Sequence, residues 1–133
     1  MPATDRSLEL AKTAAAAADD KLATTIAGID VSEQLALTDV FVIVSASNDR
    51  QVGAIVDEVE DRLRDKGAKP IRREGERDGR WVLLDFGDIV VHVQHDEERE
   101  FYELERLWKD CPAIDLGVPA RRAAVVDGER RKA

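Results

Sequence analysis

The 133-residue sequence has few of the side chains that support metal binding or thiol chemistry. It contains one cysteine, Cys111, and two histidines, His92 and His95. A single cysteine excludes an intramolecular disulfide, which fits a reducing cytosol. A zinc site needs three or four ligands, and no acidic residue stands at a familiar ligand spacing around the two histidines. The sequence therefore favours a cytoplasmic protein without a metal or another cofactor.

Long apolar runs are also missing. No run approaches the roughly 20 residues that a membrane-spanning helix needs. The first residues include Asp5 and Glu9 and lack the leucine-rich segment of a secretory signal. We therefore expect neither a membrane anchor nor secretion.

The sequence has no excess of basic residues. Acidic side chains number 28 and basic ones 20, which gives a formal net charge of −8. A general nucleic-acid binder needs a basic face that displaces counterions from phosphate, so the charge argues against that class. The charge is also uneven, because residues 121–133 hold five basic and two acidic side chains and leave −11 on residues 1–120. An acidic domain of this kind suits a basic partner surface.

The α/β pattern of the sequence predicts a single domain over residues 1–115. Apolar residues at helical spacing predict helices over residues 4–25, 49–66 and 96–111. Short runs rich in β-branched residues predict strands over residues 26–31, 40–45, 70–74, 81–84 and 89–93. Pro70 cannot donate to a strand ladder, so the strand that it opens belongs at a sheet edge. We expect a mixed sheet of about five strands flanked by helices, followed by a disordered basic tail over residues 116–133.

The stretch from Arg80 to Trp108 is the most informative part of the chain. Asp85-Phe86-Gly87-Asp88 separates two apolar runs and predicts a hairpin, because Gly87 can take a positive φ. The turn explains both aspartates without a catalytic role. Both runs are apolar at nearly every position, which predicts either burial between two layers or one face reserved for a partner. Among the aromatic residues of this stretch, Trp81 is the one that we assign to a contact surface.

Residues 45–48 raise one enzymatic alternative. Ser45-Ala46-Ser47-Asn48 follows a predicted strand and precedes a predicted helix, which is similar to the start of the nucleotide site in nucleotidyltransferase-fold enzymes. Those enzymes hold a metal on an Asp-x-Asp or Asp-x-Glu pair in the next strand, where this chain has Ile71-Arg72-Arg73-Glu74. Helix capping is the simpler interpretation of Ser47 and Asn48. A divergent enzyme that uses Ser47, Asn48 and Asp85 with magnesium and a nucleotide remains the alternative.

Several segments, taken in order, closely resemble the ribosomal silencing factor family, also called Iojap-related or RsfS proteins. The resemblance covers roughly residues 8–110 and rests on Lys21, Ile29-Asp30-Val31, Thr38 to Ile43, Ser45 to Gln51, Glu74-Gly75 and Trp81 to Trp108. The departures are mild. The family often has an aromatic residue in place of Val40, glycine in place of Ala46, tyrosine in place of Phe86 and an apolar residue in place of Gln94.

The resemblance implies a nucleotidyltransferase-like fold without enzymatic activity. Family members bind the large ribosomal subunit through ribosomal protein uL14 and block the joining of the small subunit. This action represses translation under starvation or in stationary phase, and homodimers are found in the family. The resemblance thus implies a cytoplasmic repressor. The net charge argues against binding to a membrane and against direct recognition of a nucleic-acid sequence. A bare dimerisation module is a third possibility for the function.

A docking surface can be proposed from these residues. We expect Trp81, Leu83, Asp85 and His92 on or near it, with Asp39 and Asp88 in support. The sequence leaves open on which face of the sheet this surface lies.

Overall fold

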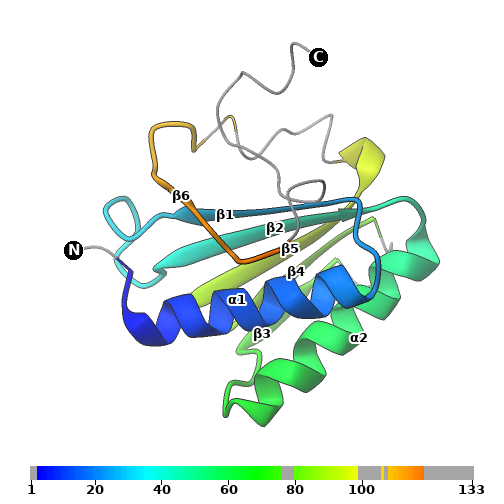
Figure 1. Ribbon diagram of the computed structural model, residues 1–133, viewed down its shortest axis with the longest axis horizontal. Helices are drawn as coiled ribbons and strands as arrows, with labels where there is room; N and C mark the ends of the chain where they lie inside the picture. The colour runs from blue at the N-terminus through cyan, green and yellow to red at the C-terminus, as the bar shows by residue number, and fades with distance from the viewer. Residues whose placement is uncertain (1–2, 76–79, 99–105, 107, 119–133) are drawn as a thin grey trace.

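Six strands form one mixed sheet in the computed structural model, which describes residues 3–75, 80–98, 106 and 108–118 (Figure 1). The strands are β1 (Thr25–Asp30), β2 (Val40–Ala46), β3 (Arg72–Glu74), β4 (Trp81–Asp85), β5 (Ile89–His95) and β6 (Ala113–Ile114). Their order across the sheet is β3-β4-β5-β2-β1-β6. β2 and β5 are parallel, and all the other neighbouring pairs are antiparallel. The expected mixed α/β architecture is confirmed.

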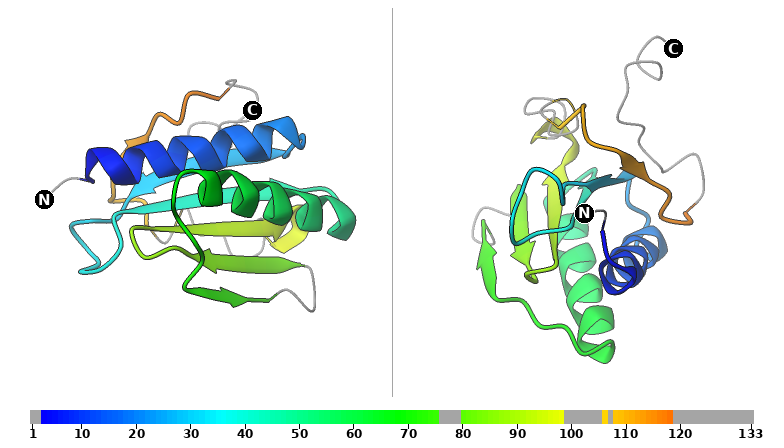
Figure 2. Two further views of the ribbon diagram at one scale, coloured as in Figure 1. Left: turned by 90° about the horizontal axis from the view of Figure 1, so that it is seen from below. Right: turned by 90° about the vertical axis from the view of Figure 1, so that its left-hand side faces the viewer.

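Two helices, α1 (Asp5–Asp20) and α2 (Asp49–Asp65), lie on the same face of this sheet (Figure 2). Each begins at a side chain that caps it. The hydroxyl of Thr4 accepts a hydrogen bond from the Ser7 amide at 3.1 Å, and the Asn48 side chain accepts one from the Gln51 amide at 2.8 Å. Neither helix, nor any other helix in the described ranges, is long and apolar enough to cross a membrane.

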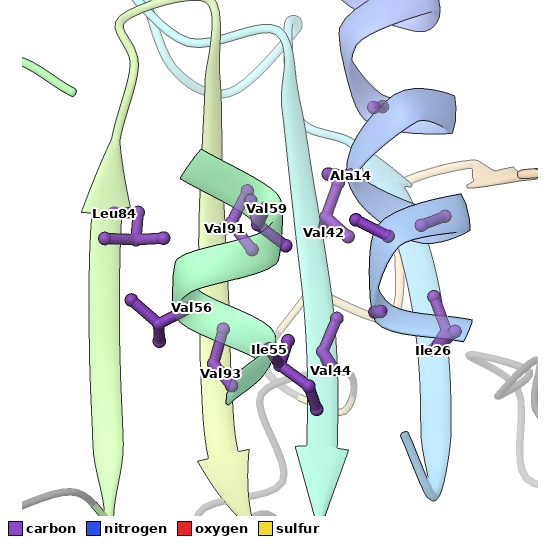
Figure 3. Close-up of a cluster of buried hydrophobic side chains, with 14 of the residues drawn as sticks. Ala14, Ile26, Val42, Val44, Ile55, Val56, Val59, Leu84, Val91 and Val93 are labelled. Carbon is purple, nitrogen blue, oxygen red and sulfur yellow. The ribbon is translucent and has the colours of Figure 1, made fainter. Parts of the chain in front are cut away.

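The main core lies between the helices and the sheet (Figure 3). The inner face of α1 is almost entirely alanine, which lets that helix approach β1 and β2 closely. The apolar stripe of α2 packs over β2, β5 and β4. The fully buried residues of this layer include Ala14, Ile26, Val42, Val44, Ile55, Val59, Leu84, Val91 and Val93.

The edge strand β3 is the one predicted from Pro70. All three of its residues are exposed, and it pairs only with β4. The guanidinium of Arg73 lies 2.6 Å from the carboxylate of Glu60 on α2, so Arg73 faces the helix layer. Because side chains alternate along a strand, Arg72 and Glu74 face the opposite side of the sheet.

The first helix is shorter than predicted. It ends at Asp20 and not at residue 25, and Leu22 takes the left-handed conformation with φ +64°. The Ala23 amide then donates to the carbonyl of Ala18 at 3.0 Å, which closes the helix end. Leu22, which falls inside the predicted helix, is 64% exposed because the chain has already turned away from the helix axis.

The sixth strand was not predicted. β6 contains two residues, Ala113 and Ile114, which pair with Ile29 and Gly28 of β1. A strand this short has no periodic signature in the sequence. Beyond it, Leu116 is buried against Gly28, where an added Cβ would lie 2.9 Å from the leucine side chain.

Parts of two predicted segments, and the connection between β3 and β4, lie outside the described residues. Residues 96–98 are helical, and half of the predicted third helix falls in 99–105 and 107. Residues 76–79, which connect β3 to β4, and residues 119–133 of the predicted tail also lie outside them. The tail was predicted to start at residue 116, but Leu116 belongs to the main core; the disorder of residues 119–133 stays a prediction, as does the domain boundary.

Candidate functional site

Four of the six residues predicted for a docking surface lie on the sheet face opposite the helices. Val82 and Leu84 of β4 belong to the helix-side core, so the alternating residues Trp81, Leu83 and Asp85 face the other way. Leu83 pairs directly with His92 of β5, which places His92 on the same face. We call Trp81, Leu83, Asp85 and His92 the β4 patch.

In the described part of the chain, this second face is covered over β1 and β2 and partly exposed over β4. Over β1 and β2 the Trp108 ring meets Phe41 edge-on at 5.1 Å, and Cys111 and Leu35 complete a small second core with Ile29 and Ile43. Over β4, by contrast, Trp81, Leu83 and Asp85 alternate with buried residues and remain partly exposed. The β4 patch therefore combines accessible apolar area with a carboxylate, which is the composition of an interface core and its rim.

Trp81 is held in place from beneath by His92. The indole N–H donates to His92 Nδ1 at 3.2 Å, which assigns the ring proton of a neutral imidazole to Nε2. Burial lowers the pKa of His92 from 6.5 to about 4, so the ring is neutral at pH 7. Phe41 packs against the same ring with the centroids 4.9 Å apart. His92, which is 6% exposed, thus supports the patch from below and orients Trp81.

Asp85 has a defined role in the hairpin that follows β4. One carboxylate oxygen accepts a hydrogen bond from the Gly87 amide at 2.9 Å, and Gly87 has φ +88° as the hairpin prediction requires. The other oxygen lies 3.7 Å from a guanidinium nitrogen of Arg72. Asp85 therefore shapes the turn while its second oxygen faces the open side of the sheet.

The two supporting aspartates differ in their surroundings: Asp39 lies at the start of α1, and Asp88 lies in the hairpin turn that Asp85 shapes. The Asp39 carboxylate accepts hydrogen bonds from the Ser7 hydroxyl at 2.8 Å and the Thr4 amide at 3.1 Å, so it anchors the start of α1. Asp88 is exposed in the hairpin turn, and its carbonyl accepts from the Asp39 amide at 2.8 Å. Both residues lie at the end of the sheet where β2 and β5 begin.

The residues of the enzymatic alternative do not come together. Ser47 donates from its amide and hydroxyl to the Gln51 side-chain oxygen at 3.1 and 3.0 Å, and Asn48 caps α2. Ala46, just before them, is level with His95 at the end of β5, whereas Asp85 is level with Val90 near its start. Five residues of strand separate the two levels, which is about 17 Å. Among the residues that the structure describes, no group of three His, Cys, Asp or Glu side chains could hold a metal ion.

Two features near the patch were missed by sequence reasoning. Gln94 is fully buried, and neither atom of its amide has a hydrogen-bond partner in the described part of the chain. The signal for it was present, since a polar residue stands where the family usually has an apolar one. The second feature is a hollow of about 290 Å³ lined by Glu74, Gly75, Trp81 and Leu83. The Glu74-Gly75 pair is visible in the sequence, but only the fold shows that this pair lies beside β4.

Comparison with known protein families gives one match over most of the chain. Residues 4–133 match the family described as "Ribosomal silencing factor during starvation". The Ribosomal silencing factor RsfS of Bacillus subtilis (strain 168) is 45% identical over 105 residues, which are 79% of this chain and 89% of that protein. The chloroplastic protein Iojap of Zea mays is 33% identical over 86% of this chain and 50% of its own length.

Solved structures give the same grouping. A crystal structure of a Chromobacterium violaceum protein superposes with a TM-score of 0.73 at 32% identity, covering 84% of this chain and 92% of that one. A crystal structure from Bacillus halodurans superposes with a TM-score of 0.71 at 37% identity, covering 80% of this chain and 97% of that one. The similarity therefore extends over nearly the whole length of each of these structures.

Proposed function

The chain belongs to the ribosomal silencing factor family, and we propose that it represses translation by binding the large ribosomal subunit through ribosomal protein uL14. Bound there, it blocks the joining of the small subunit. The observation that carries the proposal is the β4 patch, an open part of the sheet where Trp81 and Leu83 lie beside Asp85. The function requires no chemistry beyond binding, and the residues of the enzymatic alternative lie at opposite ends of the sheet.

The charge of the chain supports a protein partner on the ribosome. A net charge of −8 is repelled by ribosomal RNA and attracted by a basic ribosomal protein. The repulsion also disfavours binding elsewhere on an RNA-rich surface. An apolar patch on an acidic domain therefore suits docking on a basic ribosomal protein in the cytoplasm.

Trp81 is the expected hot spot of the β4 patch. Tryptophan is enriched among the residues that dominate interface energies. The hydrogen bond to His92 already orders the indole, so little side-chain entropy is lost on binding. We expect Trp81→Ala to weaken binding by about 2 kcal/mol, which is about 30-fold in Kd.

Co-sedimentation with isolated large and small ribosomal subunits tests the proposal. The unaltered protein should bind large subunits alone, Trp81→Ala should bind about 30-fold more weakly, and Leu83→Ala should lose a smaller part of the affinity. Lys12→Ala is a matched control, because Lys12 is exposed on α1 on the other side of the sheet. Failure of the unaltered protein to bind large subunits would remove the function. Full binding by a folded Trp81→Ala variant would exclude the β4 patch as the docking surface.

We further propose that the free protein forms a homodimer. If two copies bury the β4 patch against each other, dimer and ribosome compete for the same residues. Analytical ultracentrifugation distinguishes the arrangements, because Trp81→Ala then lowers both dimerisation and ribosome binding. A dimer that tolerates Trp81→Ala would use a different surface.

A further inference from the structure

The open face is hollowed at its edge, where β3 meets β4. Glu74, Gly75, Trp81 and Leu83 line this space of about 290 Å³. It falls at the small end of the roughly 300–1,000 Å³ of small-molecule sites, so it suits a single side chain. We propose that this hollow receives one basic side chain, an arginine or a lysine, of the protein partner. The inference rests on the proposed function and specifies the chemistry that the partner presents to the β4 patch.

Gly75 forms one wall of the hollow. Glu74 pairs with Leu83 across the β3–β4 ladder, so their side chains lie next to each other on the open face. The chain then turns at Gly75 with φ +84°, and an added Cβ would lie 1.9 Å from the carbonyl oxygen of Trp81. Only glycine is tolerated at this close approach to the Trp81 backbone, so residue 75 lines the hollow with backbone alone.

The lining matches the two parts of a long basic side chain. The Trp81 ring and Leu83 offer apolar surface for the methylene groups, and an aromatic face also attracts a cation. The Glu74 carboxylate, whose side chain is 54% exposed, stands at the rim for the charged end. Asp85 adds a second carboxylate on the same face, one alternation along β4 from Leu83. An acidic side chain would meet repulsion from both carboxylates.

The position of Arg72 in this chain indicates where a positive charge of the partner would bind. Its Nε lies 3.2 Å from a Glu74 oxygen, and a terminal nitrogen lies 3.7 Å from an Asp85 oxygen. Arg72 thus bridges the two carboxylates, with 58% of its side chain exposed. An incoming cation competes with Arg72 for Glu74. Removal of Arg72 should therefore strengthen binding, which is the opposite of what loss of a direct contact would do.

The experiment compares three isosteric or near-isosteric variants in their binding to large subunits and to purified uL14, at low and high salt. Glu74→Gln should lower the affinity about fivefold at low salt and less at high salt. Arg72→Gln should raise it. Glu9→Gln is the matched control, because Glu9 is also half exposed (50%) and paired with basic side chains, Lys66 at 3.2 Å and Arg6, but lies on the helix side.

The outcomes separate this inference from the proposed function. The inference that a basic side chain occupies the hollow is overturned if Glu74→Gln leaves the affinity unchanged, or if Arg72→Gln lowers it. If Trp81→Ala abolishes binding while Glu74→Gln leaves it intact, the function stands and the inference falls. If the unaltered protein does not bind, both fall.

Discussion

Acidification should destabilise the folded protein between about pH 6.5 and pH 4 because of His92. Burial lowers the pKa of this histidine from 6.5 to about 4, so across this range the unfolded chain binds a proton that the folded chain does not. The contribution of neutral His92 is complete above pH 6.5 and is lost as the pH falls toward 4. At about 1.4 kcal/mol for each pKa unit, the loss is about 3 kcal/mol. Domains of this size are stable by about 5–15 kcal/mol, so the loss is a large fraction.

Urea unfolding followed by circular dichroism between pH 7.5 and 4.5 measures this loss. His92→Gln should flatten the pH dependence of the free energy of unfolding across the range, whatever its stability at neutral pH. His95→Gln leaves His92 in place and should keep the slope. Circular dichroism is preferable to tryptophan fluorescence, because Trp81 donates directly to His92.

Equal slopes for the unaltered protein and His92→Gln would refute this reasoning. Asp30 contributes below this range. Burial raises the pKa of Asp30, but hydrogen bonds from Ser32 and the Ala3 amide outweigh it and hold that pKa below 3.8. The contribution of Asp30 is therefore present above pH 3.8 and is lost only at more acid values.

Three further substitutions test the packing. Leu22→Asn should raise the free energy of unfolding by about 0.5–1 kcal/mol, since asparagine tolerates φ +64° better than leucine and the side chain is exposed; a thermal melt that moves downward would contradict this. Gly28→Ala should lower the free energy of unfolding by about 1–3 kcal/mol, because its Cβ would meet Leu116 at 2.9 Å. Most of that loss should vanish in a Leu116→Ala background. Purely additive losses in urea unfolding would exclude the contact. Gln94→Leu should stabilise the protein by about 1–2 kcal/mol, because it removes two buried amide atoms that have no partner in the described residues; a lower denaturation midpoint would argue against it.

The features of the fold that could be predicted are set by local chemistry. The helix starts at Thr4 and Asn48 follow from side chains that bond their own backbone, and the turn at Gly87 follows from a residue that takes φ +88° freely. The edge position of β3 follows from a missing donor at Pro70. Each of these signals is contained within a few residues of sequence.

The features that could not be predicted depend on contacts between distant segments. β6 consists of two residues that become a strand only because β1 offers an unpaired edge. The left-handed turn at Leu22 uses a residue type that ordinarily avoids it. Periodicity therefore indicated α1 but placed its end too late.

In the candidate site, too, some features could be predicted from the sequence and others depend on the fold. Trp81, Leu83 and Asp85 share a face because they alternate along one strand, which the sequence already implies. The fold decides that this face is the one opposite α1 and α2, and the Ser7 hydroxyl and the Thr4 amide hold Asp39 at the start of α1. The hollow beside Trp81 is lined by residues of β3, of β4 and of the turn at Gly75, which only the fold brings together.

Subunit joining tests the central claim most directly. Large subunits incubated with the protein are mixed with small subunits, and joined ribosomes are measured by light scattering, with Trp81→Ala as the comparison. The account predicts that the unaltered protein lowers joining in proportion to its occupancy of large subunits, and that Trp81→Ala restores joining at the same concentration. Normal joining with large subunits fully occupied by the protein would contradict the account.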